Sequence, residues 1–354
     1  MKSPNTTTGS SNNVIQTSSP HEKSPTISLM SSHDAITQHI KHMAELAGVH
    51  VHSAQSQAVH ASSIMRIDDT HTSEPVVRIT FHPAYAPYFE TEKDTFHIED
   101  DAHTLLDMMI SVGSINRGSI IGVINTHGGV GASTIAFCLA QRYAQEHTTA
   151  LIDLDPTSSG IDAWNEFQGI TGLRWPDIHE ESGTLVPGRL TQALPQKSNL
   201  RLLSADQRGS VDLTSSQAYR AISALSQNNE ITILDIPRHS IKEHDDILQW
   251  CDILLIVTES NKKGARQLAA IISDDLGECR LVAVANKAKS GTQVAAFTQD
   301  INDNTLTTID VLPVRSSKMF NKDIQQGMPP NTYKRSGMNK DINALFSQCK
   351  ELLS

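Results

Sequence analysis

Several residue types that mark common protein classes are scarce or badly spaced in this sequence. Four cysteines occur among 354 residues, and no two of them form a C-x-x-C pair. This spacing argues against a zinc site and against a disulfide framework, and it fits a reducing compartment. Aromatic residues make up 5% of the chain, so we expect Ile, Leu, Val and Ala to form the cores.

Long apolar segments and an excess of positive charge are also missing. The first residues, MKSPNTTTGSSNN, are polar, and no apolar run approaches the roughly 18 residues of a membrane-spanning helix. We therefore predict a cytoplasmic protein. The formal net charge is −10, and because binding to a phosphate backbone needs clustered Lys and Arg, we do not expect DNA as a partner.

Composition divides the chain into three parts. Residues 1–24 are rich in Ser, Thr, Asn and Pro and are predicted to be a disordered tail. Residues 25–113 alternate short apolar strands with two helical patterns, which predicts a small α/β domain. Residues 118–354 carry seven apolar runs at intervals suited to helical crossovers: SIIGVIN, ALIDLD, LRLLSA, ITILDI, DILLIVT, RLVAVAN and LTTIDVL. Such runs are typical of strands buried on both faces, so we predict an α/β fold with a mostly parallel seven- or eight-stranded sheet.

The first of these runs leads into a glycine-rich loop with the sequence THGGVGAST. A Walker loop reads G-x-x-x-x-G-K-[ST], and here Ala132 stands at the lysine position. The loop lies between a predicted strand and a predicted helix, so its N–H groups are expected to cradle a phosphate at the helix N-terminus. The residues expected to contact a nucleotide are Gly128, Gly129, Val130, Gly131, Ala132, Ser133 and Thr134. The alternative is a glycine turn without a ligand.

Three aspartates follow or end buried strands. Asp153 and Asp155 end the run ALIDLD, and Asp235 ends ITILDI. Ligands of open α/β sheets bind at the carboxyl edge, where these carboxylates are expected to hold hydrated Mg²⁺ and orient an attacking water. Alternatively, strand-end aspartates cap helices or turns.

The segments HGGVGAST, ALIDLDP, LDIP and VANK, in this order and spacing, resemble the MinD/ParA family of deviant Walker ATPases over about residues 118–354. The segment GLRWPDI at 172–178 looks like a signature of the actinobacterial CpaE-like, septum-site-determining branch of that family. The resemblance implies ATP and Mg²⁺ as ligands. It also implies that Asp155 positions the hydrolytic water and that Ser133, Asp153 and Asp235 serve the metal. Asn286 would meet the adenine with Pro313 nearby, although an Asn at a strand end also caps turns.

The departures from the family pattern concern positive charge. Family members carry lysine at the positions of His127 and Ala132. Loss of one charged donor at a developing oxyanion costs on the order of 10²- to 10³-fold in rate, so hydrolysis is predicted to be weak or partner-dependent. Arg238, Lys262 and Lys263 are candidates to supply the charge from elsewhere in the chain.

Three hypotheses about function remain open. The first is an ATP-binding switch, acting as a homodimer, that positions a pilus-assembly, secretion or septation apparatus. The second is an active ATPase that cycles for localisation or partition, and the third is a nucleotide-free interaction scaffold. Under the first, the protein is cytoplasmic or peripheral at the inner face of the membrane, a pole or the septum.

Residues 25–113, placed before this ATPase-like half, resemble a CheY-like receiver domain. A working receiver needs an acidic pair after its first strand, a phosphoacceptor aspartate after its third and a lysine after its fifth. Here Met30-Ser31-Ser32 replaces the acidic pair, and Asp68 or Asp69 stands near the acceptor position. We therefore predict a pseudo-receiver used for docking.

The C-terminal residues carry two further patterns. Basic residues gather between Arg315 and Lys340, which predicts a solvated loop or contact with an anionic surface. The last segment places Ile342, Leu345, Phe346, Cys349, Leu352 and Leu353 at helical spacing. A helix docked on its own domain is favoured over a membrane-binding helix, because only Lys340 and Lys350 flank the stripe.

Overall fold

The computed structural model describes most of the chain from Ile27 onward. The described residues are 27–47, 49, 51–53, 63–69, 75–81, 93–115, 117–155, 160–163, 167–178, 185–208, 213–238, 247–248, 250–273, 276, 279–305, 309–315 and 337–354. The predicted tail at 1–24 and most of the basic segment after Arg315 lie outside these residues.

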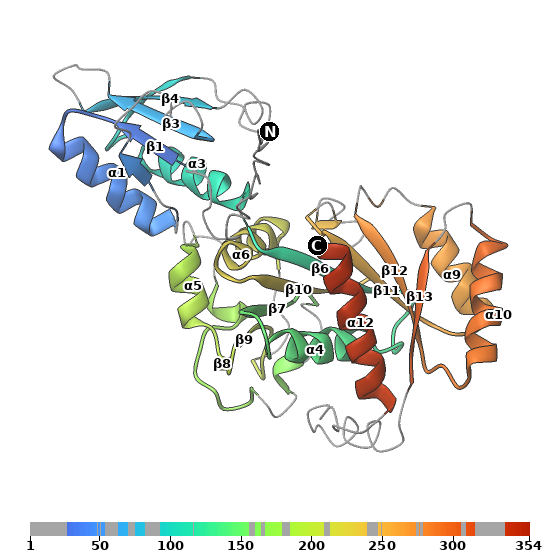
Figure 1. Ribbon diagram of the computed structural model, residues 1–354. Coiled ribbons are helices and arrows are strands. Elements are labelled where there is room, and N and C mark those ends of the chain that lie inside the picture. The colour runs from blue at the N-terminus through green and yellow to red at the C-terminus, as the bar shows by residue number, and fades with distance from the viewer. Residues whose placement is uncertain are drawn as a thin grey trace, which may run out of the picture.

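The first part of the chain forms a five-stranded sheet, and its described residues include the helices α1 and α3 (Figure 1). Its elements are β1 (Ile27–Met30), α1 (Asp34–Ala47), β2 (Val51–Ser53), β3 (Met65–Asp69), β4 (Val76–Phe81), β5 (Thr95–His97) and α3 (Ala102–Ile115). The strand order is β2-β1-β3-β4-β5, the order of flavodoxin-like sheets. However, β4 runs antiparallel to both β3 and β5.

The second part contains eight strands and the helices between them. Its strands are β6 (Ser119–Asn125), β7 (Thr149–Asp153), β8 (Gln196–Lys197), β9 (Leu200–Leu203), β10 (Ile231–Ile236), β11 (Ile253–Glu259), β12 (Arg280–Asn286) and β13 (Asp310–Val314). Its helices are α4 (Ala132–Tyr143), α5 (Pro187–Ala193), α6 (Ser215–Asn228), α9 (Lys262–Ile272), α10 (Gly291–Asn302) and α12 (Gly337–Leu353), with short 3₁₀ turns at Ile161–Ala163 and Trp175–Asp177.

The eight strands form one sheet in the order β13-β12-β11-β6-β10-β7-β9-β8. All neighbouring pairs are parallel except β8 and β9. The predicted α/β fold with a mostly parallel sheet is therefore confirmed. All seven apolar runs contain strands, and the central strands β7 and β10 are buried throughout, which explains their continuous apolar character.

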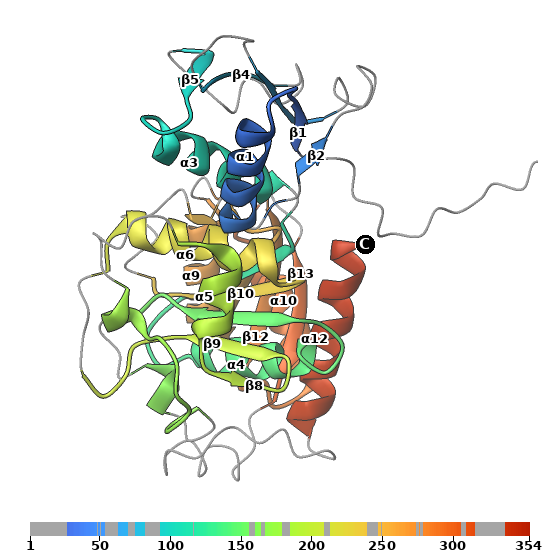
Figure 2. The ribbon, with the colours of Figure 1, turned by 90° about the vertical axis from the view of Figure 1, so that its left-hand side faces the viewer.

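Helices cover both faces of this sheet (Figures 1 and 2). One apolar core joins the sheet to α5, α6, α9 and α10, and a second core joins the opposite face to α4 and α12. The carboxyl ends of β6, β7 and β10 remain as the edge from which the glycine loop and the aspartates emerge.

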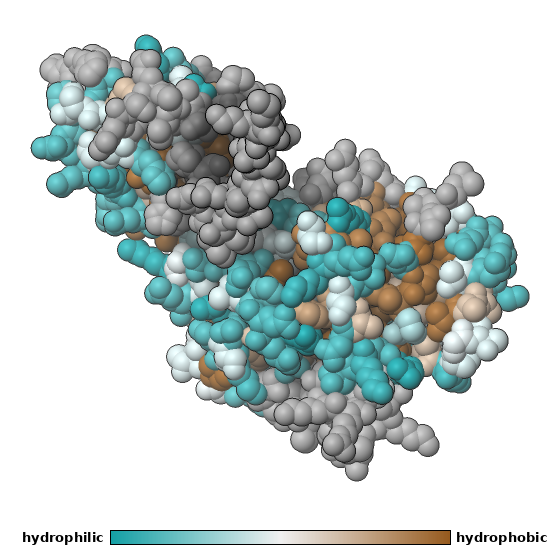
Figure 3. All heavy atoms as spheres, in the orientation of Figure 1, coloured by the Kyte–Doolittle hydropathy of each residue, from teal (hydrophilic) through white to brown (hydrophobic). Residues whose placement is uncertain are grey.

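The C-terminal helix α12 packs on α4, which confirms the predicted docking on its own domain. Phe346 lies edge-on to Tyr143 with ring centroids 4.7 Å apart, and the Arg142 guanidinium lies 3.8 Å from the Phe346 centroid. Apolar residues gather beside α12 over β11 to β13 in Figure 3. None of the described helices combines the length and the apolar character that a membrane span requires.

The two sheets are joined through their helices. Helix α3 of the first part lies against α6 of the second, where the Gln227 side-chain amide donates to the Ile110 carbonyl at 3.1 Å. A side chain at Gly113 would collide with Gln227, since an added Cβ would lie 2.4 Å from its Oε1 atom. The absence of a side chain at Gly113 therefore allows this close approach.

Candidate functional site

The glycine loop joins the buried strand β6 to the N-terminus of α4. Gly129 and Gly131 have φ values of 76° and 95°, a region that L side chains rarely adopt, and Gly131 is the N-cap of α4. A Cβ added at Gly128 or Gly129 would meet nothing within 4 Å. The loop backbone therefore faces open space at a helix N-terminus, the arrangement that receives phosphate in strand-loop-helix motifs.

A side chain from a distant strand fixes the far side of this loop. Asn286, at the end of β12, donates its Nδ2 to the Val130 carbonyl at 2.6 Å, and its Oδ1 accepts from the Lys287 N–H at 2.8 Å. Gly131 must lack a side chain here, since a Cβ would lie 2.8 Å from Asn286 Nδ2. Asn286 thus holds the loop backbone, a role that its predicted contact with adenine did not anticipate. Pro313 lies beside it, since β13 pairs Pro313 with Ala285.

The two positions at which the family pattern has lysine carry no fixed positive charge. The imidazole Nδ1 of His127 lies 2.9 Å from the carbonyl of the neighbouring Gly128, so the ring folds back on its own loop. Ala132 is 4% exposed and belongs to the apolar core with Ile135. Any cation at this loop must therefore come from another element.

Two of the predicted metal-binding aspartates lie side by side. Strands β7 and β10 pair in parallel with Asp153 opposite Asp235, so both carboxylates lie at one level of the sheet. Ser133, in the first turn of α4, hydrogen bonds to the Asp235 carboxylate. The structure therefore brings together three residues that the sequence placed far apart.

Burial and mutual repulsion shape the protonation of these carboxyls. Burial, followed by the charge of Asp153, raises the pKa of Asp235 to about 8. Burial also raises the pKa of Asp153 to about 6, although hydrogen bonds from Ser204, Asp155 and Ile161 oppose this shift. Burying two carboxylates without a neighbouring cation raises the free energy of the folded state, and a bound divalent cation would lower it.

The two aspartates differ in what their oxygens contact. Asp153 Oδ1 accepts from the Asp155 N–H at 3.0 Å, and its Oδ2 accepts from Ser204 Oγ at 2.7 Å and from the Ile161 N–H at 3.0 Å. Both oxygens of Asp153 are thus engaged, and this carboxylate orients the backbone at Asp155. The Ser133 hydroxyl and the Asp235 carboxylate supply oxygen ligands of the kind that Mg²⁺ takes alongside water and substrate phosphates. The described residues contain no group of three His, Cys, Asp or Glu side chains preformed for a metal.

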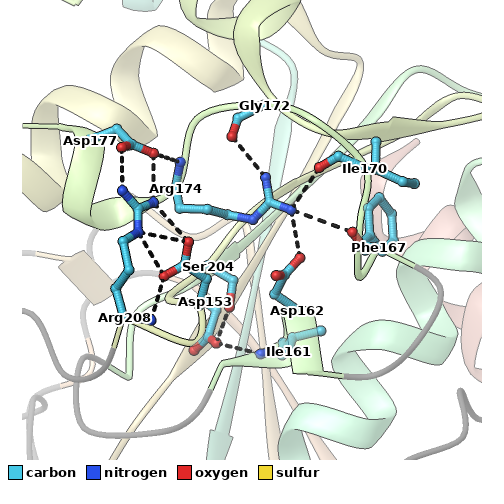
Figure 4. Close-up of polar contacts among 11 residues, drawn as sticks. Asp153, Ile161, Asp162, Phe167, Ile170, Gly172, Arg174, Asp177, Ser204 and Arg208 are labelled. Carbon is cyan, nitrogen blue, oxygen red and sulfur yellow. Dashed lines mark hydrogen bonds and ion pairs between the residues drawn. The ribbon is translucent and has the colours of Figure 1, made fainter.

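The segment GLRWPDI supports the strand end that carries Asp153 through Trp175, and Figure 4 shows the contacts of its Arg174 and Asp177. Trp175 is 1% exposed, and its indole N–H donates to the Asp153 carbonyl at 2.6 Å. Arg174 donates to Asp162 Oδ1 at 2.8 Å and to the carbonyls of Gly172, Ile170 and Phe167. The sequence alone suggested a stiff turn with an aromatic anchor. The structure shows that this turn is hydrogen bonded to the end of the strand that carries Asp153.

Among the described residues, two cations contact the loop, and both come from other elements. Arg238, two residues after β10, donates its Nη1 to the Thr126 carbonyl. Lys287 Nζ lies 3.4 Å from the Gly129 carbonyl and 2.9 Å from Glu259 Oε1. Among the described contacts, Lys262 and Lys263 at the start of α9 make none with the loop. The sequence offered Arg238 as a candidate without placing it and did not point to Lys287, although both residues follow strands that end at the loop's edge of the sheet.

Solved structures with this fold include ParA and MinD ATPases. The ParA family ATPase from Chlorobium tepidum TLS covers 66% of this chain and 98% of its own, with a TM-score of 0.53 and 17% identity. The cell division ATPase MinD from Pyrococcus furiosus covers 66% of this chain and 99% of its own, with a TM-score of 0.52 and 15% identity. The second part of the chain thus has the fold of ParA/MinD-type P-loop ATPases.

Curated relatives match a smaller share of the chain. The uncharacterized protein Rv3660c of Mycobacterium tuberculosis is 30% identical over 154 residues, which is 44% of this chain and 43% of that protein. This chain therefore spans less than half the length of the curated relatives that it matches. No protein-family model matches the chain.

Proposed function

We propose that residues 118–354 form a nucleotide switch that binds Mg-ATP at the loop between β6 and α4. The observation that carries this proposal is the open glycine loop beside the Ser133–Asp235 pair on a ParA/MinD-type sheet. Two proteins of this fold have been solved with nucleotide: MinD of Pyrococcus horikoshii with Mg-ADP, and a putative plasmid partition protein of Borrelia burgdorferi with AMPPNP, at TM-scores of 0.52 and 0.51.

In this proposal each residue at the carboxyl edge of the large sheet has a separate role. The loop amides from Gly128 to Thr134 hold the phosphates, and Ser133 and Asp235 hold Mg²⁺. The ion would supply charge neutralisation at the phosphate. Asp153 fixes the backbone of Asp155 through the Asp155 N–H, and Asp155 orients the attacking water. Asn286 secures the loop through the Val130 carbonyl.

Calorimetric titration with Mg-ATP and with Mg-AMPPNP tests this function. We expect saturable binding of both nucleotides, phosphate release that is slow for the chain alone, and a larger mass by light scattering when AMPPNP is present. Asp155→Ala is expected to abolish the residual phosphate release while changing the affinity for AMPPNP less than threefold, because Asp155 acts on the water. Absence of binding to either nucleotide would leave the scaffold hypothesis.

We further propose that the nucleotide-bound state is a homodimer that positions a pilus-assembly, secretion or septation apparatus, with peripheral contact at the membrane. Support comes from the solved MinC:MinD cell division complex of Aquifex aeolicus, whose fold matches with a TM-score of 0.53 at 16% identity. Fast phosphate release without any partner would instead favour the cycling ATPase.

The first domain is proposed to be a pseudo-receiver that serves docking. At the ends of its central strands, Asp69 is 7% exposed and its Oδ2 accepts from Ser31 Oγ at 2.7 Å and from the Ser32 N–H at 2.8 Å. Serines thus stand where a working receiver carries metal-binding acids. In addition, Lys93, which precedes β5, is paired with Asp101 at 2.8 Å.

Incubation with acetyl phosphate and Mg²⁺ tests the pseudo-receiver. We expect no phosphoryl adduct on Asp68 or Asp69, because the described residues offer no second carboxylate beside Asp69 from the end of β1. An acid-stable, base-labile mass increase of one phosphoryl group on either aspartate would contradict the prediction. A working receiver treated in parallel shows that the phosphodonor is active.

A further inference from the structure

The phosphate loop has lost both of its own cations, so the source of positive charge is the open question at this site. A triphosphate carries several negative charges, and backbone amides supply only partial positive charge. Nearby aspartates add to the repulsion, since Asp153 and Asp235 lie opposite each other on adjacent strands. A loop that binds a nucleotide here needs a cation from a neighbouring element.

Arg238 reaches the loop from the adjacent strand. Strand β10 pairs in parallel with β6, so the residues that follow Ile236 lie beside those that follow Ile124. Arg238 donates its Nη1 to the carbonyl of Thr126, the first residue of the loop. Thr126 is itself fixed: it is fully buried, its N–H donates to the Val257 carbonyl at 3.0 Å, and its Oγ1 donates to Thr258 Oγ1 at 3.0 Å. This anchor holds the guanidinium at the loop.

Lys287 also contacts the loop, but its charge is already matched. Its Nζ lies 2.9 Å from Glu259 Oε1, and this hydrogen bond is the largest cause of a lowered pKa of the Glu259 carboxyl. The backbone of Lys287 has a φ of 58°, in the left-handed region, directly after the end of β12. Arg238 differs, because the acceptor that its guanidinium contacts among the described residues is an uncharged carbonyl, and Arg238 is exposed.

We infer that Arg238 is the phosphate-binding cation of this site, acting in place of the missing loop lysines. A guanidinium has five N–H donors, so it keeps several for phosphate oxygens while one binds the Thr126 carbonyl. Lys287, neutralised by Glu259, would instead support the loop backbone at Gly129. The inference rests on the proposed function, because it requires that the loop bind a nucleotide.

The test compares the affinities of Arg238 variants for Mg-ATP and for AMP by calorimetry. Arg238→Ala is expected to weaken Mg-ATP binding at least tenfold and AMP binding much less, since AMP lacks the terminal phosphates. Arg238→Lys should recover part of the loss, because it restores charge without the planar fork. Lys262→Ala is the matched control and should leave both affinities unchanged. Lys287→Ala should cost less than Arg238→Ala.

A second variant moves the charge back into the loop. Adding His127→Lys to Arg238→Ala is expected to recover part of the Mg-ATP affinity, because His127 is only partly buried, and thermal unfolding is used to verify that both variants are folded. If wild-type protein binds Mg-ATP and Arg238→Ala binds it equally well, the inference is wrong and the proposed function stands. If the wild-type protein binds no nucleotide, the proposed function fails and the inference fails with it.

Discussion

Replacing Arg174 with alanine is expected to lower the free energy of unfolding by about 3–5 kcal/mol, because it leaves the buried carboxylate of Asp162 without a partner. The two side chains are 5% and 10% exposed, and Arg174 Nη2 lies 2.8 Å from Asp162 Oδ1. The same guanidinium donates to three backbone carbonyls, which would lose their donor. Removing one partner of such a pair therefore costs more than the pair itself contributes.

Thermal unfolding measures this loss. For a domain of this size each kcal/mol shifts the midpoint by about 2–4 °C, so we expect a decrease of roughly 10 °C. Lys350→Ala is the matched control, since Lys350 pairs with Glu146 at 3.3 Å through side chains that are 57% and 39% exposed. Ion pairs of that exposure contribute about 1 kcal/mol or less. Equal shifts for the two variants would show that burial of the Arg174–Asp162 pair is unimportant.

The Arg174→Ala substitution should also affect ligand binding at the candidate nucleotide site. The Arg174 segment places Trp175, whose indole N–H binds the Asp153 carbonyl at 2.6 Å. Arg174→Ala is therefore expected to weaken Mg-ATP binding at temperatures where the variant is still folded. This effect would show that the segment GLRWPDI keeps the strand end with Asp153 in the position that nucleotide binding requires.

Replacing Asp235 with asparagine is expected to affect stability and binding in opposite directions. Asp235 is 5% exposed and lies opposite Asp153, so its carboxylate is both desolvated and repelled. Asparagine keeps the shape and an acceptor for Ser133 and cannot ionise, so it avoids the cost of burying a carboxyl that must take up a proton at neutral pH because its pKa is raised. We expect a higher unfolding midpoint for the nucleotide-free variant. Mg-ATP affinity should fall at least tenfold, because the metal loses a charged ligand.

Calorimetry with and without Mg²⁺, together with thermal unfolding, separates the two effects. The magnesium dependence of ATP binding should largely disappear in Asp235→Asn. Asp303→Asn, an exposed change after α10, should alter neither quantity. A variant that is less stable and binds Mg-ATP normally would show that Asp235 has a structural role and does not serve a metal.

The periodicity of the sequence predicted most strands and the mostly parallel direction of the large sheet, but it did not predict the strand directions in the first sheet. Seven strands of the large sheet were visible because strands buried on both faces require continuous apolar residues. Strand β8 was missed because its two residues, Gln196 and Lys197, are exposed and pair only with β9. In the first domain the strands were found, yet apolar alternation is the same in parallel and antiparallel pairs. The reversal of β4 was therefore not predictable from the pattern.

The sequence by itself determined the glycine loop, the aspartates at strand ends and the absence of both loop lysines. These features are local, since each depends on residue types within a few positions of one strand end. Only the tertiary structure decided which side chains reach the loop. Arg238 contacts Thr126 across 112 residues and Asn286 contacts Val130 across 156. Such contacts follow from the order of strands in the sheet, which buried apolar runs do not encode because every central strand has the same apolar character.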